Sequence, residues 1–369
     1  MRGAEIDLLT LAPATTEPLT LPRGVRLHPI KVVEDNYLAR AIAFRDAVGR
    51  ALYALKPDVV HFRGPFEGQA ATRYAAHRKI PSIFEVNGLP SVELRYHHPA
   101  VSAAPAFEGK LRAAEQSLLS RAALILTQSD ATRRFLMLRA QAPLAAPIVV
   151  VPNGADPALL ALPRRRLDAT NVERLPRLLY VGSLAPWQGL GELLGAAARL
   201  RKQLDFRLEI IGQSRREWQK RLARAIRGFK LREHVEIRDP VGPEQLREAL
   251  STSDVCIAPL RHDRRNRLQG CSPIKIFEYK AAGRAIVASD LPCIQEIVAH
   301  GEDGWLAKAS SPHRLREALA HLLENAELVD QLGARARRSV EESATWPHRQ
   351  AAVASAYAAL LAGRAHARA

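Results

Sequence analysis

One segment carries most of the information on fold and site, and it reads Gly270-Cys271-Ser272-Pro273-Ile274-Lys275-Ile276-Phe277-Glu278-Tyr279-Lys280-Ala281-Ala282-Gly283. Ser272 is a preferred residue for a helix N-cap, and Pro273 suits the first helical position. Lys275 and Glu278 are three positions apart, so we expect them on one face of the helix. A β-branched run at 285–288 follows and predicts a strand. A helix that leads into a buried strand is the repeating unit of parallel α/β sheets.

The start of this helix is a candidate phosphate site. A helix N-terminus binds phosphate through its backbone N–H groups and its dipole. We therefore expect the amides of Gly270, Cys271 and Ser272 to face a ligand. Lys275 would then neutralise a diphosphate and Glu278 would bind ribose hydroxyls. On spacing alone, a surface Lys–Glu pair on an ordinary capped helix is the commoner interpretation, so both stay open.

The alternation of strand and helix patterns runs through the chain twice. The first series predicts strands at 6–11, 58–62, 82–86, 123–127 and 148–151 and helices at 36–55, 69–78 and 110–120. The second predicts strands at 177–181, 207–211, 234–238, 255–258 and 285–288 and helices at 190–201, 215–228, 243–251 and 273–282. This order predicts two α/β, doubly wound, Rossmann-like domains that face each other across a cleft. We place them at 1–170 and 171–345, with a polar linker at 171–176, and expect a last helix at 346–369 to pack back on the first domain.

Ligands of open α/β sheets bind beyond the carboxyl ends of the strands. In the second domain these ends supply the candidate binding residues Gly182, Ser183, Gln188, Gly189, Gly212 and Val241. In the first domain they supply the candidate catalytic residues His61, Glu85 and Asn87, which would join Lys275. A histidine after a strand is more often a packed residue than a catalyst, so His61 keeps both interpretations.

Composition restricts the partners and the class of protein. The 369 residues include 54 basic and 38 acidic side chains, a formal charge of +16, which suits phosphates, nucleic acid or an acidic membrane face. An arginine-rich composition from a GC-rich genome is the alternative source of this excess. No nucleic-acid module signature accompanies it, so we expect no nucleic-acid partner. The three cysteines have neither disulfide nor zinc spacing, no Asp-x-Asp follows a strand, and we expect no metal or other cofactor.

Neither an N-terminal apolar segment typical of a signal peptide nor an apolar run of roughly 18 residues occurs in the sequence. We therefore expect a cytoplasmic protein whose contact with the inner face of the membrane is peripheral.

The segment from Ser272 to Glu296 closely resembles family 4 glycosyltransferases of the GT-B fold. The resemblance implies that Glu278 binds the ribose of a nucleotide sugar and that the turn from Ser272 to Lys275 lies near the donor phosphates and sugar. Members of the family commonly carry two glutamates eight positions apart, but Gly270 stands at the first of these positions. The motif Asn153-Gly154-Ala155-Asp156 also matches the signature that closes the first domain in this family, although a simple turn is the alternative interpretation.

A second motif, Tyr180-Val181-Gly182-Ser183-Leu184-Ala185-Pro186-Trp187-Gln188-Gly189, resembles the opening of the family's second domain. Family members usually have an arginine and a lysine where this chain has Ser183 and Gln188. Those cations neutralise the donor diphosphate. We therefore expect Lys275, the backbone amides and Arg261 or Arg264 to carry more of this role.

The resemblance to bacterial exopolysaccharide enzymes implies retaining transfer, without metal, from a nucleotide-diphosphate sugar to a glycan or lipid-linked acceptor at an anionic membrane. A non-catalytic GT-B module that binds nucleotide-sugar or glycan, and a sugar-nucleotide epimerase, are the alternatives. Family members usually begin with a strand and a Gly-rich loop, whereas 6–11 of this chain resembles their second strand. We expect the first domain to lack that first strand and loop in this sequence, and the true start to lie upstream.

Overall fold

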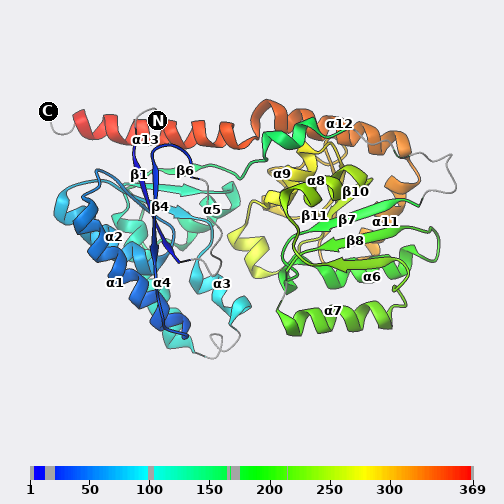
Figure 1. Ribbon diagram of the computed structural model, residues 1–369, viewed down its shortest axis with the longest axis horizontal. Coiled ribbons are helices and arrows are strands. Elements are labelled where there is room, and N and C mark those ends of the chain that lie inside the picture. The colour runs from blue at the N-terminus through cyan, green and yellow to red at the C-terminus, as the bar shows by residue number, and fades with distance from the viewer. Residues whose placement is uncertain are drawn as a thin grey trace. The chain divides into compact units, whose positions relative to one another are not determined.

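The computed structural model describes residues 4–12, 21–98, 104–163, 167, 175–213 and 215–366 (Figure 1). It divides into two compact units. The first comprises residues 1–128, 136–151 and 353–369, and the second comprises residues 129–135 and 152–352. Most of the predicted linker, residues 171–174, lies outside the described residues. Each unit is described by itself.

The first unit contains two parallel sheets. One pairs β1 (Ile6–Leu11) with β2 (Val25–Ile30), and the other has the order β3-β4-β5-β6. Its strands are β3 (Val60–Phe62), β4 (Ser82–Val86), β5 (Leu124–Thr127) and β6 (Ile148–Val150). Among the described residues no strand joins β1 to β3, so the strands do not form the single continuous sheet of a doubly wound domain.

Local chemistry explains where helices of the first unit begin. Helix α1 (Tyr37–Leu55) starts after Asn36, whose Oδ1 accepts from the amides of Leu38 at 2.9 Å and Ala39 at 3.3 Å. Helix α2 (Pro65–Arg78) starts four residues before the predicted 69, because Pro65 occupies its first turn and the Glu67 carboxylate accepts from the Gly64 amide.

The sequence patterns missed five elements of the chain. These are strands β2 and β12 (Trp305–Lys308) and helices α3 (Pro90–His97), α5 (Asp130–Arg139) and α10 (Pro292–Gln295). The predicted helix at 110–120 is found as the longer α4 (Pro105–Arg121). The short or irregular apolar patterns of these segments give little periodicity to recognise.

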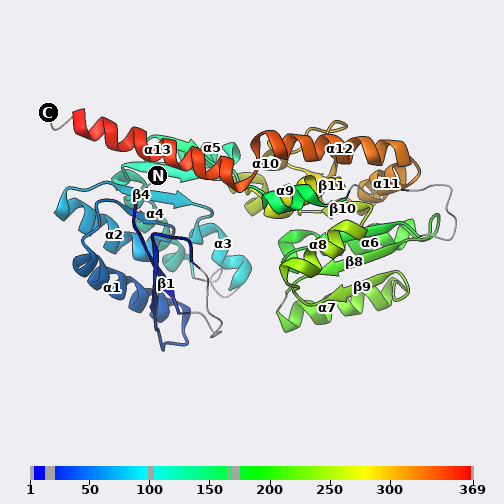
Figure 2. The same cartoon turned by 45° about the horizontal axis from the view of Figure 1, so that its top comes forward.

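The carboxyl-terminal helix α13 (Trp346–His366) covers part of the four-stranded sheet from Val353 onward. Its residues Val353, Ala356, Tyr357 and Leu360 pack on the core formed by Ile83, Leu124 and Leu126. Figure 2 shows this helix running alongside β4 and α5. The last helix therefore packs on strands β4 and β5, which are formed by residues from a much earlier part of the chain.

The second unit is built on one six-stranded parallel sheet of order β12-β11-β10-β7-β8-β9. The strands are β7 (Arg177–Val181), β8 (Arg207–Ile211), β9 (Val235–Arg238), β10 (Val255–Ala258), β11 (Ala285–Asp290) and β12 (Trp305–Lys308). The α-helices are α6 (Leu190–Leu200), α7 (Arg216–Gly228), α8 (Pro243–Thr252), α9 (Ile274–Ala281), α10 (Pro292–Gln295), α11 (Pro312–Leu323) and α12 (Ala326–Ser343). Short helical turns lie at Pro157–Ala161, Pro186–Gln188 and Arg265–Gln269.

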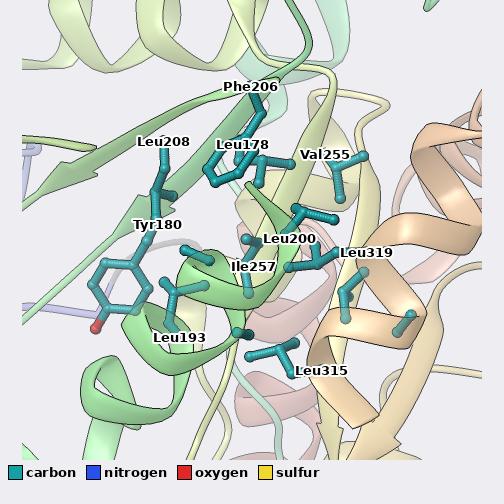
Figure 3. Packing of buried hydrophobic residues seen from close by; sticks show 14 of the residues in the cluster. Leu178, Tyr180, Leu193, Leu200, Phe206, Leu208, Val255, Ile257, Leu315 and Leu319 are labelled. Carbon is teal, nitrogen blue, oxygen red and sulfur yellow. The ribbon is translucent and has the colours of Figure 1, made fainter. Parts of the chain in front are cut away.

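Both faces of this sheet are buried. Along β7, Leu178 and Tyr180 belong to one core cluster and Leu179 to the other, as the two-residue period of a strand requires. Figure 3 shows the first cluster, where Leu178, Tyr180 and Leu208 meet helical leucines. Because both faces are covered, the strands appear in the sequence as continuous apolar runs.

Candidate functional site

The carboxyl ends of β7 and β8 approach each other so closely that only glycine fits at either. A Cβ on Gly212 would lie 1.8 Å from the carbonyl oxygen of Gly182, and a Cβ on Gly182 would lie 2.7 Å from Lys275 Nζ. Gly182 has a φ of +140°, in the region that disfavours residues with side chains. A Cβ on Gly189 would lie 1.7 Å from the carbonyl oxygen of Pro259. These glycines let Lys275 reach the end of the central strand.

Lys275 lies at the carboxyl end of β7, beside Gly182, with only 8% of its surface exposed. Its Nζ donates to Gln188 Oε1 at 2.9 Å and lies 3.9 Å from the centroid of the Tyr180 ring. In the described part of the chain no carboxylate forms an ion pair with this ammonium. Burial lowers the pKa of Lys275 to about 7. We call Tyr180, Gly182, Gln188 and Lys275 the Lys275 cluster.

Tyr180 fixes the loop that follows β7. Its hydroxyl donates to the carbonyl oxygen of Ser183 at 2.8 Å and contacts Gln188 Oε1 at 3.3 Å. Figure 3 shows this hydroxyl at the edge of the core, turned away from the labelled leucines. Gln188 Oε1 thus faces two donors. Sequence reasoning missed Tyr180, although a polar-tipped residue two positions before a strand-end glycine was a usable signal.

The turn before α9 differs from its predicted form in two respects. The Gly270 amide donates to the carbonyl oxygen of Arg265 at 3.1 Å, so the expectation that it faces a ligand is wrong. Ser272 does not cap the helix, because α9 begins at Ile274 without a side-chain cap. The Ser272 hydroxyl instead accepts from the Asn153 amide at 3.0 Å, and Asn153 Nδ2 donates to the Ser272 carbonyl oxygen. The Pro-Asn-Gly turn, predicted as a family marker, therefore holds the candidate phosphate turn in place.

Cys271 turns its side chain into the core. It is 7% exposed, and its Sγ lies 3.8 Å from Sγ of Cys293, also buried. Any contribution of Cys271 to ligand binding would therefore come from its backbone.

The structure explains why glycine stands at position 270. Gly270 has a φ of +80°, and a Cβ there would lie 2.9 Å from the Ala131 Cβ and 3.0 Å from Ser129 Oγ. The segment beside it is fixed, because both oxygens of Glu296 accept from the amides of Asp130 and Ala131 at 2.7 Å. A glutamate at 270 would meet both backbone strain and crowding.

Glu278 lies one turn beyond Lys275 on α9 and is partly exposed. Its carboxylate forms no hydrogen bond or ion pair within the residues that the structure describes. Burial raises the pKa of Glu278, and the Lys275 ammonium opposes this effect. A carboxylate held without a partner beside a buried ammonium is suited to bind hydroxyl groups.

The other residues predicted to bind the donor in the second unit lie in different surroundings. Val241 follows β9 and packs, partly buried, on the second core cluster. Arg261 forms an ion pair with Glu192 at 2.9 Å, so its cation is already neutralised, contrary to the expected phosphate role. Arg264 is exposed.

In the first unit, the predicted catalytic residues meet around Glu85. Its carboxylate accepts from Asn87 Nδ2 at 2.8 Å and from Arg63 through Nε at 3.0 Å and Nη2 at 2.9 Å. His61 Nε2 lies 2.9 Å from Glu85 Oε2. Burial by itself raises the pKa of Glu85, but hydrogen bonds from His61 and Arg63 outweigh it and hold this pKa at about 2. We call His61, Arg63, Glu85, Asn87 and Tyr357 the Glu85 cluster.

Tyr357 of α13 completes this cluster, which sequence reasoning did not foresee. Its hydroxyl lies 2.6 Å from His61 Nδ1, and burial raises the pKa of Tyr357 to about 12. The phenol therefore stays protonated, and the Tyr357 hydroxyl and the Glu85 carboxylate contact the two ring nitrogens of His61. Both ring nitrogens of His61 are then occupied, which leaves it no free nitrogen to act as a base.

No three His, Cys, Asp or Glu side chains gather into a metal-binding group in the described ranges, and none of the helices there combines the length and hydropathy needed to cross a membrane.

Two family models match the chain. The model described as Glycosyltransferase Family 4 matches residues 1–159, and the model described as Glycosyl transferases group 1 matches residues 175–325. A phosphatidyl-myo-inositol mannosyltransferase of Mycolicibacterium smegmatis is 29% identical over 241 residues, which are 63% of this chain and 56% of that protein. The chain thus matches little more than half the length of this relative.

The chain also shares its fold with solved structures of other proteins. Sucrose-phosphate synthase from Thermosynechococcus elongatus has a TM-score of 0.78 at 18% identity, over 98% of this chain and 90% of that chain. Anabaena HepE in complex with UDP-glucose has a TM-score of 0.69 at 15% identity, over 89% and 86% of the two chains. These likenesses confirm the predicted GT-B fold with its two Rossmann-like domains.

Proposed function

The chain belongs to glycosyltransferase family 4, and on this premise we propose that it transfers a sugar from a nucleotide-diphosphate sugar to a glycan or lipid-linked acceptor, with retention at the anomeric carbon. The proposal also places the enzyme in cell-surface or exopolysaccharide synthesis, in the cytoplasm at the inner face of the membrane.

One observation carries the proposal: Lys275 is a buried ammonium without a carboxylate partner among the described residues. A buried charge is costly unless a counter-charge accompanies it. A donor diphosphate at the ends of β7 and β8 would supply that counter-charge. The crystal structure of HepE with UDP-glucose supports this class of donor for a chain of the same fold.

The transfer step follows from where charge develops. As the bond between the anomeric carbon and the diphosphate breaks, negative charge grows on the leaving phosphate oxygens. Lys275 and the amino end of α9 would stabilise that charge, and preorganised donors of this kind are usually the largest catalytic contribution. The acceptor hydroxyl attacks from the same face and gives its proton to the leaving phosphate. No resident metal is required, since Lys275 supplies the cation.

The proposed class of acceptor is inferred from the name of a related protein. The matched mycobacterial protein is named for phosphatidyl-myo-inositol, a lipid. This name and the basic composition of the chain support a lipid-linked acceptor at an anionic membrane.

Thermal unfolding with UDP, GDP, ADP, TDP and their common sugars tests the proposal. A ligand at 100 times its dissociation constant adds about 2.7 kcal/mol to the free energy of unfolding. We expect one nucleotide to stabilise the wild type and Glu342→Ala, an exposed control on α12, but not Glu278→Ala. Failure of every nucleotide to stabilise the folded wild type would contradict the proposed donor. Product from a matched donor and a lipid-linked acceptor, with its anomeric configuration determined by NMR, would test transfer and retention.

A further inference from the structure

Helix α7 is the most one-sided charged element of the second unit. Its thirteen residues from Arg216 to Gly228 contain five basic side chains and one acidic side chain, Glu217. The basic residues, all exposed, are Arg216, Lys220, Arg221, Arg224 and Arg227. None of the five forms an ion pair with a carboxylate in the part of the chain that the structure describes. Arg224 Nε donates to the backbone oxygen of Lys220 at 3.3 Å.

These cations share one face. At 100° per residue they fall within an arc of about 140°, and Leu222 and Ile226 lie on the opposite side of the helix. Leu222 and Ile226 are buried in the core of the second unit. Figures 1 and 2 show α7 at the outside of this unit. The cationic face therefore points to solvent.

The like charges on this face repel one another, and Glu217 is the one acidic side chain within the arc. Arg216 and Lys220, and Lys220 and Arg224, are like-charge pairs four positions apart, which destabilise a helix. An external polyanion would turn this repulsion into attraction.

We propose that the outer face of α7 docks the enzyme on an anionic lipid membrane. Four of the five cations lie within about 80° of one another on one helix, and an exposed face of this kind fits a flat charged surface. Helix α7 itself offers no base-stacking platform on this arc, because its one aromatic residue, Trp218, packs edge-to-face on Trp187 with ring centroids 5.7 Å apart. Single-stranded nucleic acid is bound through such platforms, so the surface favours a membrane.

Helix α7 also packs on the loop that belongs to the Lys275 cluster. Trp187, on which α7 packs, directly precedes Gln188, whose side chain accepts from Lys275. The membrane would thus be held beside the loop that faces the proposed donor. The docking surface rests on the proposed function, because it would bring the enzyme to a lipid-linked acceptor. Binding to vesicles requires neither donor nor sugar transfer, so an experiment can contradict one proposal without contradicting the other.

The test uses the full chain and vesicles of phosphatidylcholine with or without phosphatidylglycerol, in a sedimentation assay. Arg224→Gln/Arg227→Gln removes two cations of the arc. Arg335→Gln/Arg338→Gln is the matched control, because these two exposed arginines have the same spacing on α12 of the same unit. Thermal unfolding verifies that both variants fold.

We expect the wild type to bind only the anionic vesicles and to release them at high salt. Each cation near an anionic surface contributes about a fivefold effect, so the α7 variant should bind about 25-fold more weakly while the control changes less than about twofold. Equal losses in both variants, or no binding of the wild type to anionic vesicles, would overturn the proposal. It is also overturned if duplex DNA at equal charge concentration displaces the protein from vesicles and the α7 variant loses DNA affinity to the same extent.

Discussion

The Lys275 cluster and the Glu85 cluster both lie at the carboxyl ends of parallel strands, yet their charges are satisfied in opposite ways. Glu85 is surrounded by donors from Arg63, Asn87 and His61, and nothing in its carboxylate remains unbonded. Lys275 has one amide oxygen and the face of an aromatic ring, but forms no ion pair with a carboxylate of the described residues. The comparison indicates that the first cluster is an internally complete, positioning structure. We propose that the second is completed by a bound ligand.

Lys275→Met should produce the largest effect and the clearest contrast. Loss of one partner of a buried charge pair costs several kcal/mol, so we expect nucleotide-sugar affinity to fall by about 1000-fold. The ligand-free protein should become more stable, because a buried ammonium is replaced by an apolar chain of similar length. Calorimetric titration and thermal unfolding measure the two changes, with the exposed Lys308→Met as control. If the variant is less stable than the wild type and still binds nucleotide-sugar, Lys275 has a structural role and does not bind the donor.

Glu85→Gln should mainly affect stability. The pKa of Glu85 is about 2 in the folded protein, below the ordinary value of 4.5, so its contribution to stability is present above pH 4.5 and is lost as the pH falls toward 2. This shift corresponds to about 3 kcal/mol of the free energy of unfolding at neutral pH. Urea unfolding at pH 7 and pH 3 should show the variant's deficit shrinking at the lower pH.

Nucleotide affinity should be little changed in Glu85→Gln, and Glu34→Gln, an exposed control in the same unit, should match the wild type throughout. A large loss of nucleotide affinity on Glu85→Gln would remove the contrast between the two clusters.

The pH dependence of donor binding should distinguish the clusters again. Lys275 has a pKa of about 7, so above that pH its charged fraction falls, and affinity for a nucleotide-sugar should decrease about tenfold per pH unit. The sign reverses for the ligand-free protein, whose stability should rise above pH 7 because the unfolded chain still holds the proton. Titrations in buffers of different ionisation enthalpy should show proton uptake on binding. The same slope in Lys275→Met would assign it to another group.

Tyr357→Phe should have the smallest effect. It removes one hydrogen bond to His61 and should cost about 1 kcal/mol of stability. Nucleotide affinity should not change, since the bond lies wholly within the first unit. Thermal unfolding measures the loss, and Tyr53→Phe, a half-exposed residue of α1, provides the control. A loss of transfer activity at unchanged stability would instead give Tyr357 a role in positioning His61 for the reaction.

Much of the Lys275 cluster could be predicted from the sequence, because most of its residues follow a buried strand or lie near the start of a helix. Gly182, Gln188 and Lys275 were predicted from strand-end glycines and from helix spacing, and the structure brings them together. The unforeseen partners, Tyr180 and Asn153, have side chains whose contacts depend on how the loops fold back. Gly270 shows the limit: its amide donates within its own loop, which no sequence pattern reveals.

The sequence by itself determined the alternation of strands and helices, the GT-B fold and the family, because buried parallel strands and glycine turns leave local patterns that survive without knowledge of the packing. The tertiary structure alone decided which charges are satisfied. Tyr357 is 296 positions from His61, and Asn153 is 119 from Ser272. Hydrogen bonds over such separations depend on distances of a few ångströms that only the packed chain sets. Those distances decide that the Glu85 carboxylate is fully hydrogen-bonded, whereas the Lys275 ammonium forms no ion pair with a described carboxylate.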